Sequence, residues 1–134
     1  MSIESAIVNL INSNDDLVEL IDEKIYPINL PQDTALPAIV YQQIIETEPM
    51  TTEGALGLIE SRFQITCWAD SHNDCVELAE KLRAALADAS GIYAGVIILH
   101  IQVVGRGDIP AIDIEAEQIS RFGKFIDFIV SYEN

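Results

Sequence analysis

The sequence predicts one α+β domain over residues 1–134, a mainly antiparallel β-sheet with helices packed on one face. Three observations support this fold class. The chain has 134 residues and is 49% hydrophobic, which suits a single globular core. Residues 58–69 alternate apolar and polar side chains with a period of two, as a half-buried strand does. Residues 72–89 instead repeat apolar side chains every three or four positions, as an amphipathic helix does.

Two helices are expected at the start of the chain. The first carries one apolar stripe, made of Ile3, Ala6, Ile7, Leu10 and Ile11. A run of cap-forming side chains interrupts it, and a short second helix follows over residues 17–21, capped by Ser13 or Asn14. Asp15 and Asp16 suit the first turn of that helix, because the helix dipole favours carboxylates there.

Short strands and loops are expected next. Residues 25–27 end in proline, which cannot donate a ladder hydrogen bond, so they predict a brief edge strand. Residues 29–37 contain two prolines and predict an extended loop, and residues 38–45 predict the following strand. Residues 46–57 hold one proline and two glycines and predict a long hairpin loop or protrusion.

The strand over residues 58–69 leads directly into the longest helix. Its inward positions are Ile59, Phe63, Ile65, Cys67 and Ala69. Ser71 is expected as the helix N-cap, with Asp74 as its capping-box partner. The helix is expected to continue to Ala89, and Gly91 to serve as its C-cap.

Two more strands are expected at the end of the chain. Residues 94–104 predict a strand with Ile97, Leu99, Ile101 and Val103 on one face. Residues 105–116 predict a second long loop because they contain two glycines and a proline. Residues 118–132 predict the last strand, whose inward side chains are Phe122, Ile126, Phe128, Val130 and Tyr132.

The charge balance is strongly acidic, with 22 acidic residues against 7 basic ones and a net charge of −15. Binding to DNA phosphates needs clustered Lys and Arg, so direct nucleic-acid binding is not expected. Three interpretations of the acidity stay open. It can serve solubility, it can form a surface past which DNA slides without sticking, or it can mimic DNA at a basic site of another protein.

Membrane insertion and secretion are not expected. The most apolar run, residues 92–99, contains Gly95 and is too short to cross a bilayer. The N-terminus lacks the basic start of a secretory signal, so we expect a soluble protein made in a cytoplasm. Cys67 and Cys75 lie on inward faces without metal-binding spacing, so buried free thiols are expected, with a disulfide between them left open.

The sequence offers no constellation for catalysis, cofactor or metal binding. His72 lies between Ser71 and Asp74, but a nucleophilic triad usually draws its members from separate segments, and helix capping explains the pair. His100 is expected on the polar face of its strand. The acidic residues after Gly107 lack the fixed spacing of a calcium loop. A small hydrolase is therefore the least favoured class.

Both long loops contain apolar side chains that a solvated loop does not need. These candidate interface residues are Met50 and Leu56 in the first loop and Ile109, Ile112 and Ile114 in the second. Such residues either fold back onto the domain or are buried against another chain, and both outcomes stay open.

Several stretches, taken in order, carry a resemblance to a known family. They are the restart at residues 14–16, the segments Lys24–Pro27 and Leu30–Tyr41, the strand residues Arg62, Gln64, Trp68 and Ala69 with Ser71 and the helix that follows, and the segment Asp127–Tyr132. Together they make the chain similar to the tail completion proteins of long-tailed phages, also called tail terminator or tail-to-head joining proteins.

This resemblance implies a structural protein of the virion tail, assembled in the bacterial host cytoplasm. The implied form is a ring, expected to be a hexamer, that ends the tail tube and docks the head connector. The implied partners are copies of itself, the tail tube protein and the head–tail connector protein, without a cofactor or catalysis. DNA would pass through the ring, whose lumen or face acids would be Asp108, Asp113, Glu115 and Glu117. The competing classes are an acidic DNA-mimic inhibitor and another phage neck or baseplate protein.

The charge also bears on assembly. Six copies at −15 each repel one another, so the ring should depend on apolar contacts. We expect a monomer or weak oligomer alone and a hexamer when tube or connector proteins template it.

Overall fold

A computed structural model describes residues 2–22, 24–31, 34–47, 50–51, 54–55, 58–114 and 119–133. Its helices are α1 (Ile3–Asn12), α2 (Asp15–Ile21) and α3 (His72–Leu86). Its strands are β1 (Ile25–Pro27), β2 (Ala38–Thr47), β3 (Met50–Thr51), β4 (Gly54–Ala55), β5 (Leu58–Ala69), β6 (Gly91–Tyr93), β7 (Val96–Ile114) and β8 (Ile119–Glu133).

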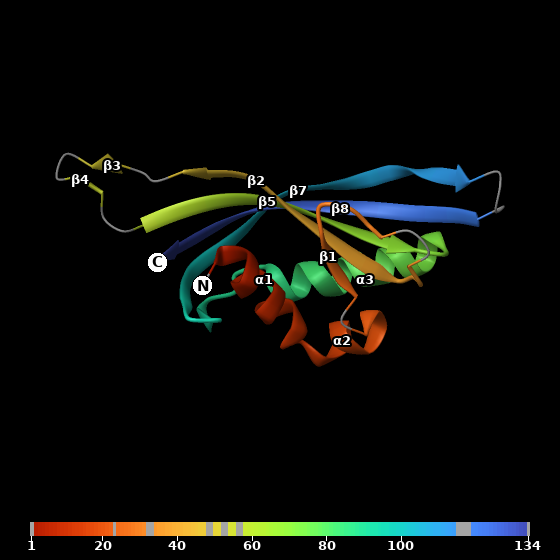
Figure 1. Cartoon of the computed structure of the whole chain (residues 1–134), viewed down its shortest axis with the longest axis horizontal. Helices are drawn as coiled ribbons and strands as arrows, with labels where there is room; N and C mark the ends of the chain where they lie inside the picture. Colours follow the sequence, from red (N-terminus) through yellow and green to blue (C-terminus); the bar gives the residue numbers. More distant parts are fainter. Residues whose placement is uncertain are drawn as a thin grey trace.

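Six strands form one sheet in the order β1-β2-β5-β8-β7-β6. Only the β1–β2 pair is parallel, and the other four pairs are antiparallel. The three helices lie on one side of this sheet, which we call the inner face (Figure 1). The predicted α+β class, a mainly antiparallel sheet with helices on one face, is therefore confirmed.

The two N-terminal helices form as their sequence predicts. All five residues of the α1 stripe are buried. Of the two expected caps for α2, Asn14 performs the role, because its side chain accepts a hydrogen bond from the Leu17 backbone N–H at 3.1 Å. Asp15 and Asp16 lie in the first turn of α2, where the exposed N–H groups favour negative charge.

The β5–α3 unit also follows its sequence pattern. The Ser71 hydroxyl accepts a hydrogen bond from the Asp74 backbone N–H at 3.1 Å and caps α3. Cys67 and Cys75 are free and buried, and the Cys75 thiol donates to the Cys67 carbonyl oxygen at 3.3 Å. Burial raises the pKa of both thiols, so they act as small apolar side chains.

The expected C-cap of α3 is wrong. The helix ends at Leu86 with Ala87 as its C-cap, and Gly91 begins β6, a strand that the sequence does not predict. Asp88 takes a left-handed φ of 58° and its N–H donates to the Ile101 carbonyl at 3.1 Å. This hydrogen bond joins Asp88 to β7, so the helix has ended and the chain has turned toward β7 before Gly91.

The core lies between the inner face and the helices. The rings of Phe63 on β5 and Phe128 on β8 stack with centroids 5.6 Å apart, and both side chains are fully buried. Each large apolar side chain buried here contributes about 1.5–3 kcal/mol. The one buried polar residue among the described ones, Ser61, has its hydroxyl hydrogen-bonded by the Gln43 amide at 3.0 Å.

The expected facing of β7 is wrong at its start. Ile97 and Leu99 are 42% and 44% exposed, whereas Ile98 is buried. A register shift between Ile98 and His100 makes Leu99 an extra, bulged residue. The bulge reverses the alternation, so that Ile101 returns to the core.

The second long loop, expected over residues 105–116, is also wrong. β7 runs on to Ile114 and pairs with β8 as far as Ile119. One register shift, at Val103/Gly105, adjoins Gly105, and another, at Ile109/Ile112, spans Pro110. β-Bulges tolerate both glycine and proline, so neither residue ends the strand. Pairing with β8 thus overrides the turn-forming composition. Within residues 46–57, where a long hairpin loop or protrusion is expected, the short strands β3 and β4 pair antiparallel beyond the end of β2 and β5 (Figure 1).

Candidate assembly surface

The sheet has an outer face, opposite the helices, that is polar at its centre. Arg62 on β5 and Asp127 on β8 form an ion pair across this face, with 3.3 Å between Nη2 and Oδ2. Gln64 lies beside Asp127 in the ladder. The guanidinium of Arg62 thus offsets the charge of the Asp127 carboxylate at the centre of the outer face.

One end of the outer face is closed by an aromatic ring. A Cβ built on Gly123 would stand 2.9 Å from Trp68 Cζ3 and 3.2 Å from Ile109 Cβ. Trp68 therefore lies over β8 at a position that only glycine allows. A hollow of about 250 Å³ adjoins this ring and is lined by Ile28, Asn29, Leu30, Val40, Thr66, Trp68 and Arg121.

The β2 and β7 strands each have an edge that is only partly paired. β1 pairs with β2 only at residues 39–41, and β6 pairs with β7 only at residues 96–98. In the part of the chain that the structure describes, no strand covers the β2 edge at residues 42–47 or the β7 edge at residues 99–114. Open edges present unpaired N–H and C=O groups to another chain.

Large exposed apolar side chains lie at or near both sides of the sheet. Among the described residues they form a β2 patch (Ile28 66%, Ile44 49% and Ile45 55% exposed) and a β7 patch (Ile92 71%, Ile97 42%, Leu99 44% and Val104 42% exposed). Ile44, Leu99 and Val104 each lie within a register shift. The bulges therefore direct apolar side chains outward at both edges.

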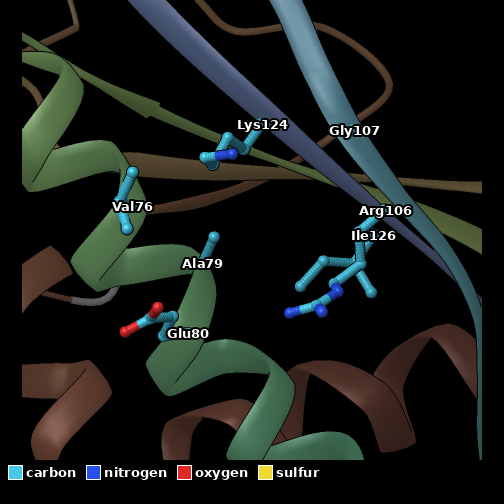
Figure 2. A pocket seen from close by; sticks show the side chains of 7 residues that line it. All are labelled: Val76, Ala79, Glu80, Arg106, Gly107, Lys124 and Ile126. Carbon is cyan, nitrogen blue, oxygen red and sulfur yellow. The ribbon is translucent and has the colours of Figure 1, made fainter.

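A groove of about 320 Å³ lies between α3 and the β7–β8 pair (Figure 2). Figure 2 shows the side chains of Arg106 and Lys124 on the strand side of this groove and Glu80 on the helix side. Lys124 Nζ donates to Asp108 Oδ1 at 2.5 Å. This hydrogen bond, with the lysine charge, lowers the pKa of the Asp108 carboxyl.

Two of the residues singled out from the sequence have described side chains, Ile109 and Asp108. Ile109 is half-buried beside Gly123 and Trp68, and Asp108 is exposed and paired with Lys124. Met50, Ile112, Ile114 and Asp113 have their backbones in strands, with side chains outside the described part; Leu56, Glu115 and Glu117 lie wholly outside it.

The structure adds edge residues that sequence reasoning missed. No sequence pattern marks Ile44, and the alternation of residues 94–104 predicts Leu99 on one face with Ile97, Ile101 and Val103. Alternation alone cannot reveal a bulge, since the bulge depends on which strand pairs opposite.

The described residues show no clustered metal site. His100 Nε2 lies 3.1 Å from Asp88 Oδ1, and His72 contacts Phe122, with 6.3 Å between ring centroids. Both histidines are exposed. Across the ranges described above, no three His, Cys, Asp or Glu side chains gather as metal ligands. None of the described helices has the length and apolar character to cross a bilayer.

One comparison with known proteins identifies a family, and another identifies a similar fold. The sequence profile of the family described as tail completion protein gp17 matches residues 5–115. A chain from the solved structure "Virion of native gene transfer agent (GTA) particle" has the same fold, with a TM-score of 0.73 and 14% identity, over 99% of this chain and 96% of that one. No curated protein sequence matches.

Proposed function

This chain belongs to the tail completion protein gp17 family, a family of virion tail proteins, and from that premise we propose that six copies form a ring that ends the tail tube and joins it to the head connector. The family match over residues 5–115 carries the proposal. In this function the chain acts by binding other proteins and does no chemistry. Its partners are further copies, the tail tube protein and the head–tail connector protein, and the ring assembles in the cytoplasm of the bacterial host.

The presence of two unlike apolar patches on one copy supports a ring. The β2 patch and the β7 patch lie at opposite sides of one sheet and differ in sequence, so they are two unlike surfaces through which copies could meet. Contacts between unlike surfaces repeat head to tail and close into a ring when the rotation between copies permits.

The passage of DNA is a second part of the proposal. Asp108 and Asp113 lie on β7, and Glu115 and Glu117 follow it in the sequence. We propose that these four acids face the ring lumen or an end face of the ring. Carboxylates there would repel phosphates and leave DNA free to move. The apolar candidates Met50, Leu56, Ile112 and Ile114 are proposed as contacts with the tube or the connector.

Deletion of the gene from the phage or prophage that encodes the chain tests the function. Electron microscopy is expected to reveal tails of irregular length and filled heads without tails, and expression of the wild-type chain in trans should restore joined particles. Tails of normal length on filled heads in the deletion strain would contradict the proposal.

A further inference from the structure

We propose that neighbouring copies join through their sheet edges: residues 42–47 of β2 in one copy lie along residues 99–105 of β7 in the next. The proposal rests on the ring described above and specifies how the ring is made. It commits to a second copy of this chain as the occupant of both open edges.

The two open stretches lie at the same level of the sheet. The ladder row through Thr47 continues through Glu60 and Ser131 to His100. The row through Gln42 continues through Gln64 and Asp127 to Gly105. Within the described residues, the rows between these two therefore end at an unpaired β2 edge and an unpaired β7 edge. Beyond the Gln42 row, β1 pairs with β2, and beyond the Thr47 row, β6 pairs with β7.

Strand direction suits this contact. β2, β5, β8 and β7 pair antiparallel in succession, so β2 and β7 run in opposite directions. Two copies placed side by side in the same orientation bring β2 of one against β7 of the other as an antiparallel pair. This arrangement also keeps the helices of both copies on one face, so the sheet continues from copy to copy.

Apolar side chains line both stretches. Ile44 and Ile45 are about half exposed, at 49% and 55%, and Leu99 and Val104 are similarly open at 44% and 42%. Association would remove these four side chains from water, which favours the joined state. Lys and Pro, which commonly protect a free edge strand, are absent from both stretches.

The charges of the two stretches also permit contact between identical copies. Residues 99–105 contain no acidic side chain, although the whole chain has 22 acids against 7 bases. Residues 42–47 contain one, Glu46, whose Oε1 accepts the Tyr132 hydroxyl on the same copy. The proposed contact therefore brings no two acidic side chains of these stretches together.

Paired cysteines and a short bis-maleimide cross-linker test the contact. Ile45 and Gln102 lie at the two ends of one ladder row. The double variant Ile45→Cys/Gln102→Cys, treated within assembled tails, should give a ladder of cross-linked species that ends at the ring size. Each single variant should stay monomeric on a denaturing gel, and a mixture of the two should stop at a dimer.

A matched control separates this contact from chance proximity. The pair Ile45→Cys/Glu80→Cys places the second thiol on the exposed surface of α3 and should give no ladder. The native Cys67 and Cys75 are buried, so the wild-type chain should stay uncross-linked.

Two outcomes would overturn the edge contact. Dimers from either single variant would mean that like edges meet, and a lack of cross-links in tails that contain the double variant would mean that the edges are apart. If the chain is missing from tails but the purified double variant gives the ladder, the edge contact stands and the tail function fails. If the ladder is missing from both preparations, the edge contact fails.

Discussion

The indole ring of Trp68 lies over the backbone of Gly123, so that a Cβ added to Gly123 would stand only 2.9 Å from Trp68 Cζ3. The two residues are direct neighbours in the β5–β8 ladder. Their contact shapes the end of the outer face and holds Ile109 beside it. Ile109, which the sequence predicts as an interface residue, therefore packs partly within the domain.

Gly123→Ala should destabilise the fold. The new methyl group would overlap Trp68 and crowd Ile109, and such overpacking costs about 1–3 kcal/mol. Urea unfolding followed by circular dichroism measures the loss. Gly105→Ala is the control, because a Cβ there meets no atom within 4 Å. Equal stability of the two variants would contradict the close approach.

Ile28→Asn should stabilise the isolated chain. Ile28 has a φ of 67° at the centre of a tight turn in which the Asn29 N–H donates to the Pro27 carbonyl at 2.7 Å. A β-branched residue is strained in this left-handed region, where Asn is tolerated, and relief is worth about 1 kcal/mol. Thermal unfolding should give a higher midpoint for Ile28→Asn than for wild type. The control Ile92→Asn changes a similarly exposed site without positive φ, and its midpoint should not rise.

Asp108→Asn should change how stability depends on pH. The hydrogen bond and charge of Lys124 lower the folded-state pKa of Asp108 below its ordinary value of 3.8. Its stabilisation is therefore present above that ordinary value and is lost as the pH falls through the lower folded pKa. Urea midpoints of wild type and variant should differ near neutrality and converge at the acid end of the series. A constant difference at every pH would contradict the pairing.

Leu99→Asp should prevent assembly and leave the fold intact. Leu99 is 44% exposed on a bulge, so the carboxylate stays solvated in the monomer but would be buried at the β7 edge of a ring. Complementation of a deletion strain should fail, while circular dichroism and the melting temperature stay close to wild type. Asn73→Asp adds the same charge on the exposed surface of α3 and should complement normally.

Salt should favour association of the purified chain. Each copy carries a net charge of −15, and at about 0.15 M salt the repulsion is screened beyond about 8 Å. Light scattering across a salt series should show growth of the average mass with ionic strength. A shift toward monomer at high salt would mean that ion pairs, rather than apolar edges, hold the copies together.

The sequence by itself determined the local elements. The apolar stripe of α1, the caps Asn14 and Ser71 and the alternation of β5 all appear in the structure as expected. These features depend on side chains within a few positions of one another, and helix and strand periods or cap chemistry are visible at that range.

Only the tertiary structure decided the length and facing of β7, the existence of β6 and the identity of the two open edges. A bulge such as that at Leu99 shifts the alternation by one residue, and it forms because β8 pairs opposite. Strand order likewise follows from contacts between segments far apart in the chain. For that reason the apolar edge side chains could be assigned to the surface only once the partners of every strand were known.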